Sequence, residues 1–431
     1  MKKCICMLLV LVFIFTACEE ENIISGQPEP TGSGQTSQAH DNSKQLEPTG
    51  SGQTPQARDI SVHEIADTAE FSVELFKKAY EETQGENTLI SPLSVLLALS
   101  MTANGADGVT LSEMESVLGG GADITKLNEF LFSYVQELYS GEGSKLGIAN
   151  SIWMKDNNSF SVKEEFLQTN KAYYGADIFK SAFDDSTLTD INNWVNNNTD
   201  GLIEEIIDEI SEDAVMFLIN AIIFDAEWER VYYENNIHSR DFTAYNGEIQ
   251  SVQMMYASEW QFISDKKATG FIKPYKGNHY SFAALLPNEG VSIDDYVGSL
   301  TGGELIKTLE NVQQTEVRTV LPKFSFDYDL SMNGVLEAMG IEQAFMPDKA
   351  DLSKLGLSEK GDLFISEVKH KTFIEVDELG TKAGAVTMVE IKANGVFSEP
   401  KAVILDRPFV FMLIDNNQNL PIFIGVVNSV G

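Results

Sequence analysis

The amino-acid sequence predicts an α+β protein with a large folded part. Its 431 residues are 43% hydrophobic and 10% aromatic, which is typical of a globular chain rather than a disordered one. Apolar residues recur at helical spacing over residues 62–82, and a second, apolar helix is expected at 95–103. Residues 217–224 have the pattern of a buried strand, and strand-like runs alternate with turns over 241–286. Both kinds of element are therefore expected in one folded part.

Residues 1–18 are predicted to be a signal segment, because two lysines at the start precede an apolar run over residues 8–15. The sequence Phe15-Thr16-Ala17-Cys18 resembles the processing site of bacterial lipoproteins, although Phe15 stands where that site usually has Leu. In such a protein Cys18 becomes the lipidated first residue, and the mature chain lies outside the cell, anchored to the membrane. The alternative is a plain secretory signal with an incidental cysteine, which gives a secreted protein.

Residues 19–58 are predicted to be a disordered tether. The octet EPTGSGQT occurs at 29–36 and again at 47–54, and this polar composition buries too little apolar area to fold. Residues 59–431 are then expected to form one domain, although their length could accommodate two.

Charge and cysteine content restrict the function further. The formal net charge of −35 argues against nucleic acid or an anionic surface as a partner. All three cysteines (Cys4, Cys6 and Cys18) lie in the first 18 residues, so the folded part has no disulfide and no thiol chemistry. With only five histidines in the chain, we expect no metal site and no cofactor.

Near the C-terminus, the segment 381–392 has a period of two. Every charge falls on one parity, whereas the other parity carries only small or apolar residues: Thr381, Ala383, Ala385, Thr387, Val389 and Ile391. This alternation is typical of a half-buried strand. Residues 393–400 follow as a turn-rich loop with an Asn-Gly pair and a proline. The simplest interpretation is an edge strand with a surface loop; the other is an exposed loop that can become a strand.

Several motifs in this chain resemble those of the serpins, the large serine-protease inhibitors. Glu378-x-Gly380-Thr381, followed by Ala, Gly and Thr, is similar to the family's hinge. The resemblance covers about residues 60–431, and it implies the serpin fold: three β-sheets, about eight or nine helices and an exposed reactive-centre loop. Further matches occur in order along the chain: NTLISPLSVLLALS from Asn87, Asn150-Ser151-Ile152-Trp153, Ile191-Asn192-Asn193-Trp194-Val195, FLINAIIF from Phe217, Leu321-Pro322-Lys323-Phe324, Met339-Gly340-Ile341, Arg407-Pro408-Phe409-Val410-Phe411 and Pro421-x-Phe423-x-Gly425.

This resemblance implies a suicide-substrate inhibitor rather than an enzyme. In such a protein a serine protease cleaves the loop, the loop inserts into the central sheet, and the covalent acyl-enzyme is trapped. The hinge residues implied here are Glu378, Gly380, Thr381, Ala383, Gly384 and Ala385. Lys382 and Val386 depart from the family's usual residues, but both have the outward parity and should not block insertion. We expect a monomer whose partners are the target protease and, through Cys18, the membrane.

The resemblance also implies a polar cluster beneath the central sheet, where the strands part to admit the loop. The matching residues are Ser91, Ser94, Asn220 and His370. Asn220 is the one polar residue in the middle of an apolar strand, and a buried asparagine needs hydrogen-bond partners. Trp228 matches a tryptophan near the top of the same opening.

The position of the cleaved bond follows from loop length. In inhibitors of this family the residue before that bond usually lies sixteen positions after the hinge acid, which from Glu378 gives Asn394–Gly395. Counting back from Pro408 by the family's commoner spacing instead gives a position near Phe397. Only the hinge side inserts, so the hinge count is preferred.

The alternative bonds are Ala393–Asn394 and Val396–Phe397. Small or uncharged residues dominate these positions, which favours elastase-like or subtilisin-like targets. Lys392 would suit a trypsin-like protease, but it lies two residues early.

Catalytic motifs are incomplete in this sequence. His63-Glu64-Ile65-Ala66-Asp67 lacks the second histidine of a zinc protease, and both Ser264-x-x-Lys267 and Ser366-x-x-Lys369 lack the rest of the acyl-enzyme signature. The competing function is therefore not an enzyme but a non-inhibitory surface binding lipoprotein, either a non-inhibitory serpin or a solute receptor. Bulky or charged residues of inward parity at the hinge would favour that alternative, and the sequence has none there.

Overall fold

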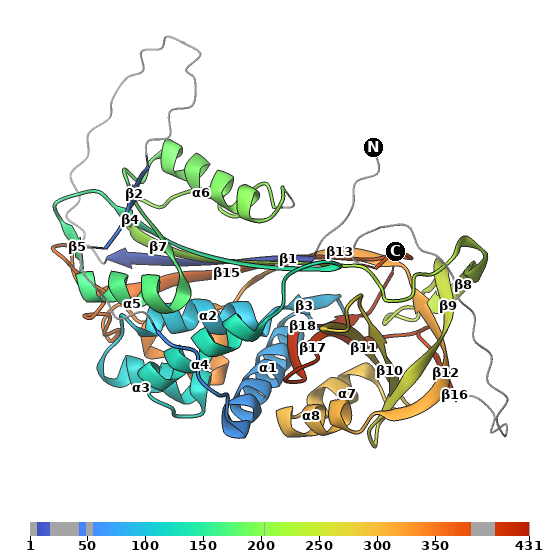
Figure 1. The fold of residues 1–431 in the computed structure, drawn as a ribbon. Coiled ribbons are helices and arrows are strands. Elements are labelled where there is room, and N and C mark those ends of the chain that lie inside the picture. The colour runs from blue at the N-terminus through green and yellow to red at the C-terminus, as the bar shows by residue number, and fades with distance from the viewer. Residues whose placement is uncertain (1–6, 18–42, 49–54, 202, 381–400, 431) are drawn as a thin grey trace, which may run out of the picture.

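The computed structural model describes residues 7–17, 43–48, 55–201, 203–380 and 401–430. A long sheet crosses the molecule, most of the helices pack below it, and α6 lies on its other face (Figure 1). A second large sheet packs beside the helices that lie below the long sheet. The predicted α+β class with three sheets is confirmed.

The described residues contain nine α-helices, which match the predicted number, and two short 3-10 segments. Among the helices that the structure describes, none combines the length and the apolar character needed to cross a membrane. The helices are α1 (Val62–Glu82), α2 (Pro92–Ala103), α3 (Gly108–Gly119), α4 (Ile124–Glu137), α5 (Glu164–Tyr174), α6 (Asp185–Asn198), α7 (Ile293–Ser299), α8 (Gly302–Glu310) and α9 (Asn333–Met339), with η1 (Glu234–Asn236) and η2 (Gln343–Phe345) as the 3-10 segments.

The long sheet has seven strands in the order β13-β15-β1-β7-β4-β6-β2. Its central strands come from opposite ends of the chain, so their pairing closes very long loops. In chain order they are β1 (Met7–Ala17), β2 (Lys44–Leu46), β4 (Ser144–Lys155), β6 (Asp177–Ser181), β7 (Ala214–Ala226), β13 (Phe324–Ser331) and β15 (Leu363–Val376).

The second sheet has nine strands, eight of them in the order β16-β12-β9-β10-β11-β17-β18-β3, with β8 paired to β9. The third sheet is the pair β14-β5. The strands of both are β3 (Thr88–Ile90), β5 (Phe160–Val162), β8 (Ile237–Thr243), β9 (Ile249–Ser264), β10 (Ala268–Pro274), β11 (Tyr280–Pro287), β12 (Gln313–Pro322), β14 (Gly356–Ser358), β16 (Lys401–Ile404), β17 (Phe409–Asp415) and β18 (Leu420–Val427).

The predicted helices over 62–82 and 95–103 are confirmed as α1 and α2, and their starts follow from the sequence. Ser61 and Glu64 form a reciprocal capping box at the start of α1. Ser91 caps α2, and Pro92 occupies its first turn, where a missing N–H costs little. Every residue of α2 is buried, so this helix is a central packing element rather than a surface one.

Strand β7 is buried on both faces. Met216, Leu218 and Ile222 belong to the main core, which α2 also lines. The residues of opposite parity, such as Phe217 and Ile219, belong to a smaller core that α6 completes with residues such as Ile191 and Val195. This double burial explains why the sequence of β7 is almost continuously apolar.

Strand β1 is formed by the apolar run of the predicted signal segment. It lies between β15 and β7 and runs antiparallel to both, with ten paired positions on each side. The dark blue arrow at the centre of the sheet in Figure 1 is this strand. The lysines and the apolar run predict a signal segment rather than a strand here. The prediction of a cleavable segment at residues 1–18 stays a prediction, and Cys18 lies outside the described residues.

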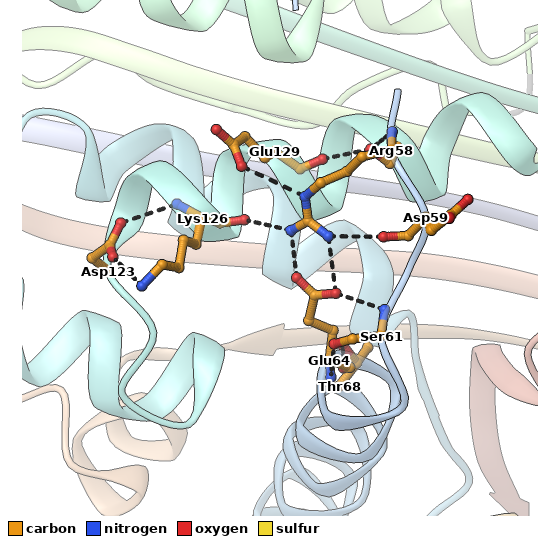
Figure 2. Close-up of polar contacts among 9 residues, drawn as sticks. Arg58, Asp59, Ser61, Glu64, Thr68, Asp123, Lys126 and Glu129 are labelled. Carbon is orange, nitrogen blue, oxygen red and sulfur yellow. Dashed lines mark hydrogen bonds and ion pairs between the residues drawn. The ribbon is translucent and has the colours of Figure 1, made fainter. Parts of the chain in front are cut away.

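The predicted tether differs from the structure in its second half. Lys44–Leu46 form β2, which pairs antiparallel with β6 at the edge of the long sheet. Arg58 donates to the Glu64 carboxylate and to the Lys126 carbonyl, and its guanidinium lies 3.5 Å from the Glu129 carboxylate (Figure 2). The β2–β6 pairing and the contacts of Arg58 with Lys126 and Glu129 join segments far apart in the sequence, so local composition does not reveal them.

Candidate functional site

A buried polar network lies beneath the middle of the long sheet. Asn220 of β7 accepts a hydrogen bond from the Ser94 hydroxyl of α2 and donates through Nδ2 to the side-chain oxygen of Asn150 at 2.7 Å. Asn150, directly opposite Asn220 on β4, donates in turn to the Tyr174 carbonyl at 2.8 Å. Each amide is therefore satisfied, as burial requires. Asn150 was missing from the predicted cluster, although it begins one of the matched motifs.

Ser91 connects this network to the second sheet. Its hydroxyl donates to the Ile422 carbonyl of β18 at 2.8 Å and accepts the backbone N–H of Ser94 at 3.3 Å. The start of α2 is therefore fixed between the two sheets. Of the cluster that the resemblance implies, the structure brings Ser91, Ser94 and Asn220 together.

His370 of β15 is separated from these residues. In the register of the sheet, Leu11 of β1 pairs with Asn220 on one side and with His370 on the other, so β1 lies between them. The His370 side chain is fully buried, and among the residues that the structure describes neither ring nitrogen has a hydrogen-bond partner. Burial lowers the pKa of His370 from 6.5 to about 3. His370, the fourth residue of the expected cluster, therefore lies on β15, separated from Asn220 by β1. It makes no hydrogen bond within the described residues.

A second set of contacts joins the ends of β7 and β15, at the edge where the chain enters the segment 381–400. We call residues 227–232 and 377–380 together the sheet mouth. The backbone N–H of Trp228 donates to the Leu379 carbonyl at 3.1 Å, and its indole N–H donates to the Asp377 carbonyl at 2.9 Å. The Tyr232 N–H donates to the Glu378 carbonyl at 2.8 Å. These bonds hold the two strand ends together across the gap that β1 fills further along.

Gly380 is required at the mouth for steric reasons. Its φ is 128°, and a Cβ added there would lie 2.4 Å from the Ala226 carbonyl oxygen. Glu378, the predicted hinge acid, forms an ion pair with Lys323, which follows β12. Burial raises the pKa of Asp377, and the Glu378 charge raises it further against the opposing backbone hydrogen bonds.

The other predicted hinge and cleavage residues lie in the segment 381–400, outside the described residues. They are Thr381, Ala383, Gly384, Ala385, Ala393, Asn394, Gly395, Val396 and Phe397. Within the part of the chain that is described, no group of three or more His, Cys, Asp or Glu residues is arranged to hold a metal ion.

Residues 66–430 match the family model of the serpins, described as serine protease inhibitors. A crystal structure of the thermophilic serpin tengpin in its native state is similar at 50% identity and a TM-score of 0.81, covering 87% of this chain and 96% of that one. A serpin-like protein of Thermococcus kodakarensis is 29% identical over 99% of this chain and 98% of its own length. Leukocyte elastase inhibitor A of Mus musculus is 29% identical over 83% of this chain and 97% of its own length.

The buried His370 should make the protein sensitive to acid. Between pH 6.5 and pH 3 the unfolded chain binds a proton at this residue that the folded chain does not bind, so stability falls as pH falls. We expect the wild type to lose up to about 1.4 kcal/mol more per pH unit below 6.5 than His370→Gln. Urea unfolding at pH 7, 6 and 5 measures this difference. The exposed His63, changed to Gln, is the control, and equal acid dependence of His370→Gln and wild type would contradict the assignment.

Proposed function

Because the chain belongs to the serpin family, we propose that it inhibits a serine protease by inserting its cleaved loop between β7 and β15. One observation carries the proposal: the long sheet has a complete strand position between β7 and β15, and a segment that is not their neighbour in sequence fills it. The segment 381–400 begins where β15 ends, so a return along β15 would run antiparallel to it, in the same direction as β1.

Insertion would be driven by backbone hydrogen bonds on both edges of the new strand. Each contributes roughly 0.5–1.5 kcal/mol net, so a strand paired on both sides gains on the order of ten kcal/mol or more. The alternation of residues 381–391 supports this step, because the inward parity carries only small or apolar side chains. The trapped protease remains an acyl-enzyme, and the inhibitor supplies no catalytic residue of its own.

The full-length chain has this strand position occupied by β1. Inhibition therefore requires that residues 7–17 leave the sheet, and processing before Cys18 would remove them. We propose that the mature protein begins at Cys18, is lipidated there and acts outside the cell, anchored to the membrane as a monomer. Removal of β1 would also let β7 and β15 approach, which would bring His370 toward Asn220 and supply the partner that its ring lacks.

We assign the cleaved bond to Asn394–Gly395, with Ala393–Asn394 and Val396–Phe397 as alternatives, and the target class to elastase-like or subtilisin-like proteases. The name of the mouse relative, leukocyte elastase inhibitor A, agrees with the first class. Residues 393–397, around the candidate bonds, carry no charge, so the target protease is expected to accept small or uncharged side chains there.

A second candidate function is a surface lipoprotein that binds without inhibiting. The occupied strand position favours it, since a chain that keeps β1 in the sheet has no place for a cleaved loop. The two candidates differ in one property: only the inhibitor forms a covalent complex.

We expect a chain beginning at residue 19 to form a complex with elastase or subtilisin that survives boiling in detergent. Thr381→Arg puts a long charge on the inward parity, and a buried unpaired charge costs several kcal/mol. This variant should be cleaved without forming the complex, as seen on a denaturing gel. Complete cleavage of the unaltered chain with no stable band, over a panel of proteases, would support the non-inhibitory candidate.

The same complex locates the cleaved bond. Mass spectrometry of the C-terminal fragment released on denaturation should give a first residue of Gly395. A fragment beginning at Ala393 would mean cleavage after Lys392 and a trypsin-like target, and one beginning at Phe397 would reject the count from Glu378.

Retention of residues 1–17 should abolish inhibition. We expect a full-length chain carrying Cys18→Ser, which keeps the segment attached, to be cleaved as a substrate. The change Val12→Pro in that chain removes a backbone donor from the centre of β1, so it should expel the strand and restore the covalent complex. Equal complex yield with and without residues 1–17 would show that β1 does not block insertion.

A further inference from the structure

A buried ion pair lies directly behind the sheet mouth. Lys273 of β10 and Glu259 of β9 are 1% and 6% exposed in their side chains, and their charged atoms lie 2.8 Å apart. Burial lowers the pKa of Lys273, and the Glu259 carboxylate opposes that shift. Charges this far from water are costly unless fully partnered, so their other contacts decide what they do.

The Lys273 ammonium uses its remaining contacts on the mouth. It donates to the Arg230 carbonyl at 2.9 Å and lies 4.4 Å from the centre of the Tyr232 ring and 5.2 Å from that of the Trp228 ring. Both distances are within the range of cation–π attraction, which is strongest where water is excluded. One cation therefore fixes the backbone and two aromatic side chains of the same short segment.

Residues 227–232 form the half of the sheet mouth that donates hydrogen bonds to the other half, residues 377–380. Trp228 and Tyr232 provide the N–H groups that bind the carbonyls of Asp377, Glu378 and Leu379. Two backbone hydrogen bonds also fix the first part of the segment. The Glu229 N–H donates to the Pro274 carbonyl, and the Lys276 N–H donates to the Glu227 carbonyl. Its second part, which carries Tyr232, is held by the Lys273 ammonium.

We propose that Lys273, with Glu259, is a positioning residue for the loop hinge. The pair holds residues 228–232 against β9 and β10. These residues in turn form hydrogen bonds with residues 377–380 and keep the sheet mouth closed until a protease cuts the loop. The claim that this contact sets the rate of insertion rests on the proposed function. The claim that it fixes the mouth does not, because it concerns hydrogen bonds of the uncleaved chain.

The test removes both charges together, since Lys273→Met alone would leave a buried carboxylate unpaired. The variant Lys273→Met with Glu259→Gln keeps side-chain length and volume. The control is Lys180→Met with Asp156→Asn, which removes an exposed ion pair of 2.7 Å from the far edge of the long sheet. The measurement is amide hydrogen exchange of the full-length chain at Trp228 and Tyr232, with amides of α2 as the reference for global stability.

We expect exchange at Trp228 and Tyr232 to quicken by about tenfold or more in the first double variant, the effect of losing roughly one well-made buried hydrogen bond, while α2 is unchanged. The control should leave all of these amides as in wild type. Unchanged exchange at both mouth amides, or an equal acceleration in α2, would overturn the proposal, the second result because it indicates general destabilisation.

If the double variant does not fold, Lys273→Gln with Glu259→Gln replaces it, because it also removes both charges together but leaves two polar side chains, with the same expectation of a local acceleration and the same contrary result. In the form of the chain that gives the covalent complex, the variant should also lose inhibitory activity on standing several-fold faster than the control. Hydrogen exchange needs no protease, so the exchange result can be interpreted even if the proposed inhibitory function is wrong.

Discussion

The need of β7 and β15 for backbone hydrogen bonds along the edges that face each other is the constraint on which the rest of the structure depends. Both strands are long and central, and the edges that they turn toward each other carry peptide groups that must be bonded. In this chain β1 satisfies both edges at once. Whatever segment occupies that position determines how far apart β7 and β15 lie, and with them α2, the buried amides and the sheet mouth.

Polar groups near this position lie at its centre and at one of its ends. Asn220 and His370 mark the centre, on strands that β1 separates. The mouth closes one end through bonds from Trp228 and Tyr232. An apolar core alone would bind β7 and β15 equally well at any spacing, because burial is not directional. Hydrogen bonds are directional, so these residues favour particular spacings of β7 and β15.

Much of the fold could be predicted because the evidence for it is local. The spacing in 62–82 and the Ser91-Pro92 cap determine α1 and α2, and the apolar run with a single asparagine determines β7. Ser91, Ser94 and Asn220 were expected as one group through the resemblance to serpins, and the structure links them through the Ser94 backbone N–H and hydroxyl. Their contacts then followed from the side chains, since a buried amide and a buried hydroxyl bond each other when brought within reach.

The remaining features depend on contacts between distant segments. An uninterrupted apolar run such as residues 8–15 has no periodicity, so it fits a signal segment and a central strand equally well. The polar composition around Lys44 and Arg58 predicts disorder, because it does not show that the β6 edge pairs with Lys44 or that Arg58 contacts Lys126 and Glu129 in the fold. Likewise, nothing in the sequence links Lys273 to Glu259 until β9 and β10 are paired.

The short strand β2 has a consequence for the solution behaviour of the protein. It bonds to Lys180, Phe179 and Ile178 of β6, which would otherwise be the exposed edge of the long sheet. An open edge of this kind is a template for the strands of other molecules, and a short edge strand with charged residues discourages such pairing. A protease that trimmed the N-terminal region beyond Leu46 would therefore remove β2. It would expose a fresh sheet edge and favour self-association of the trimmed molecules.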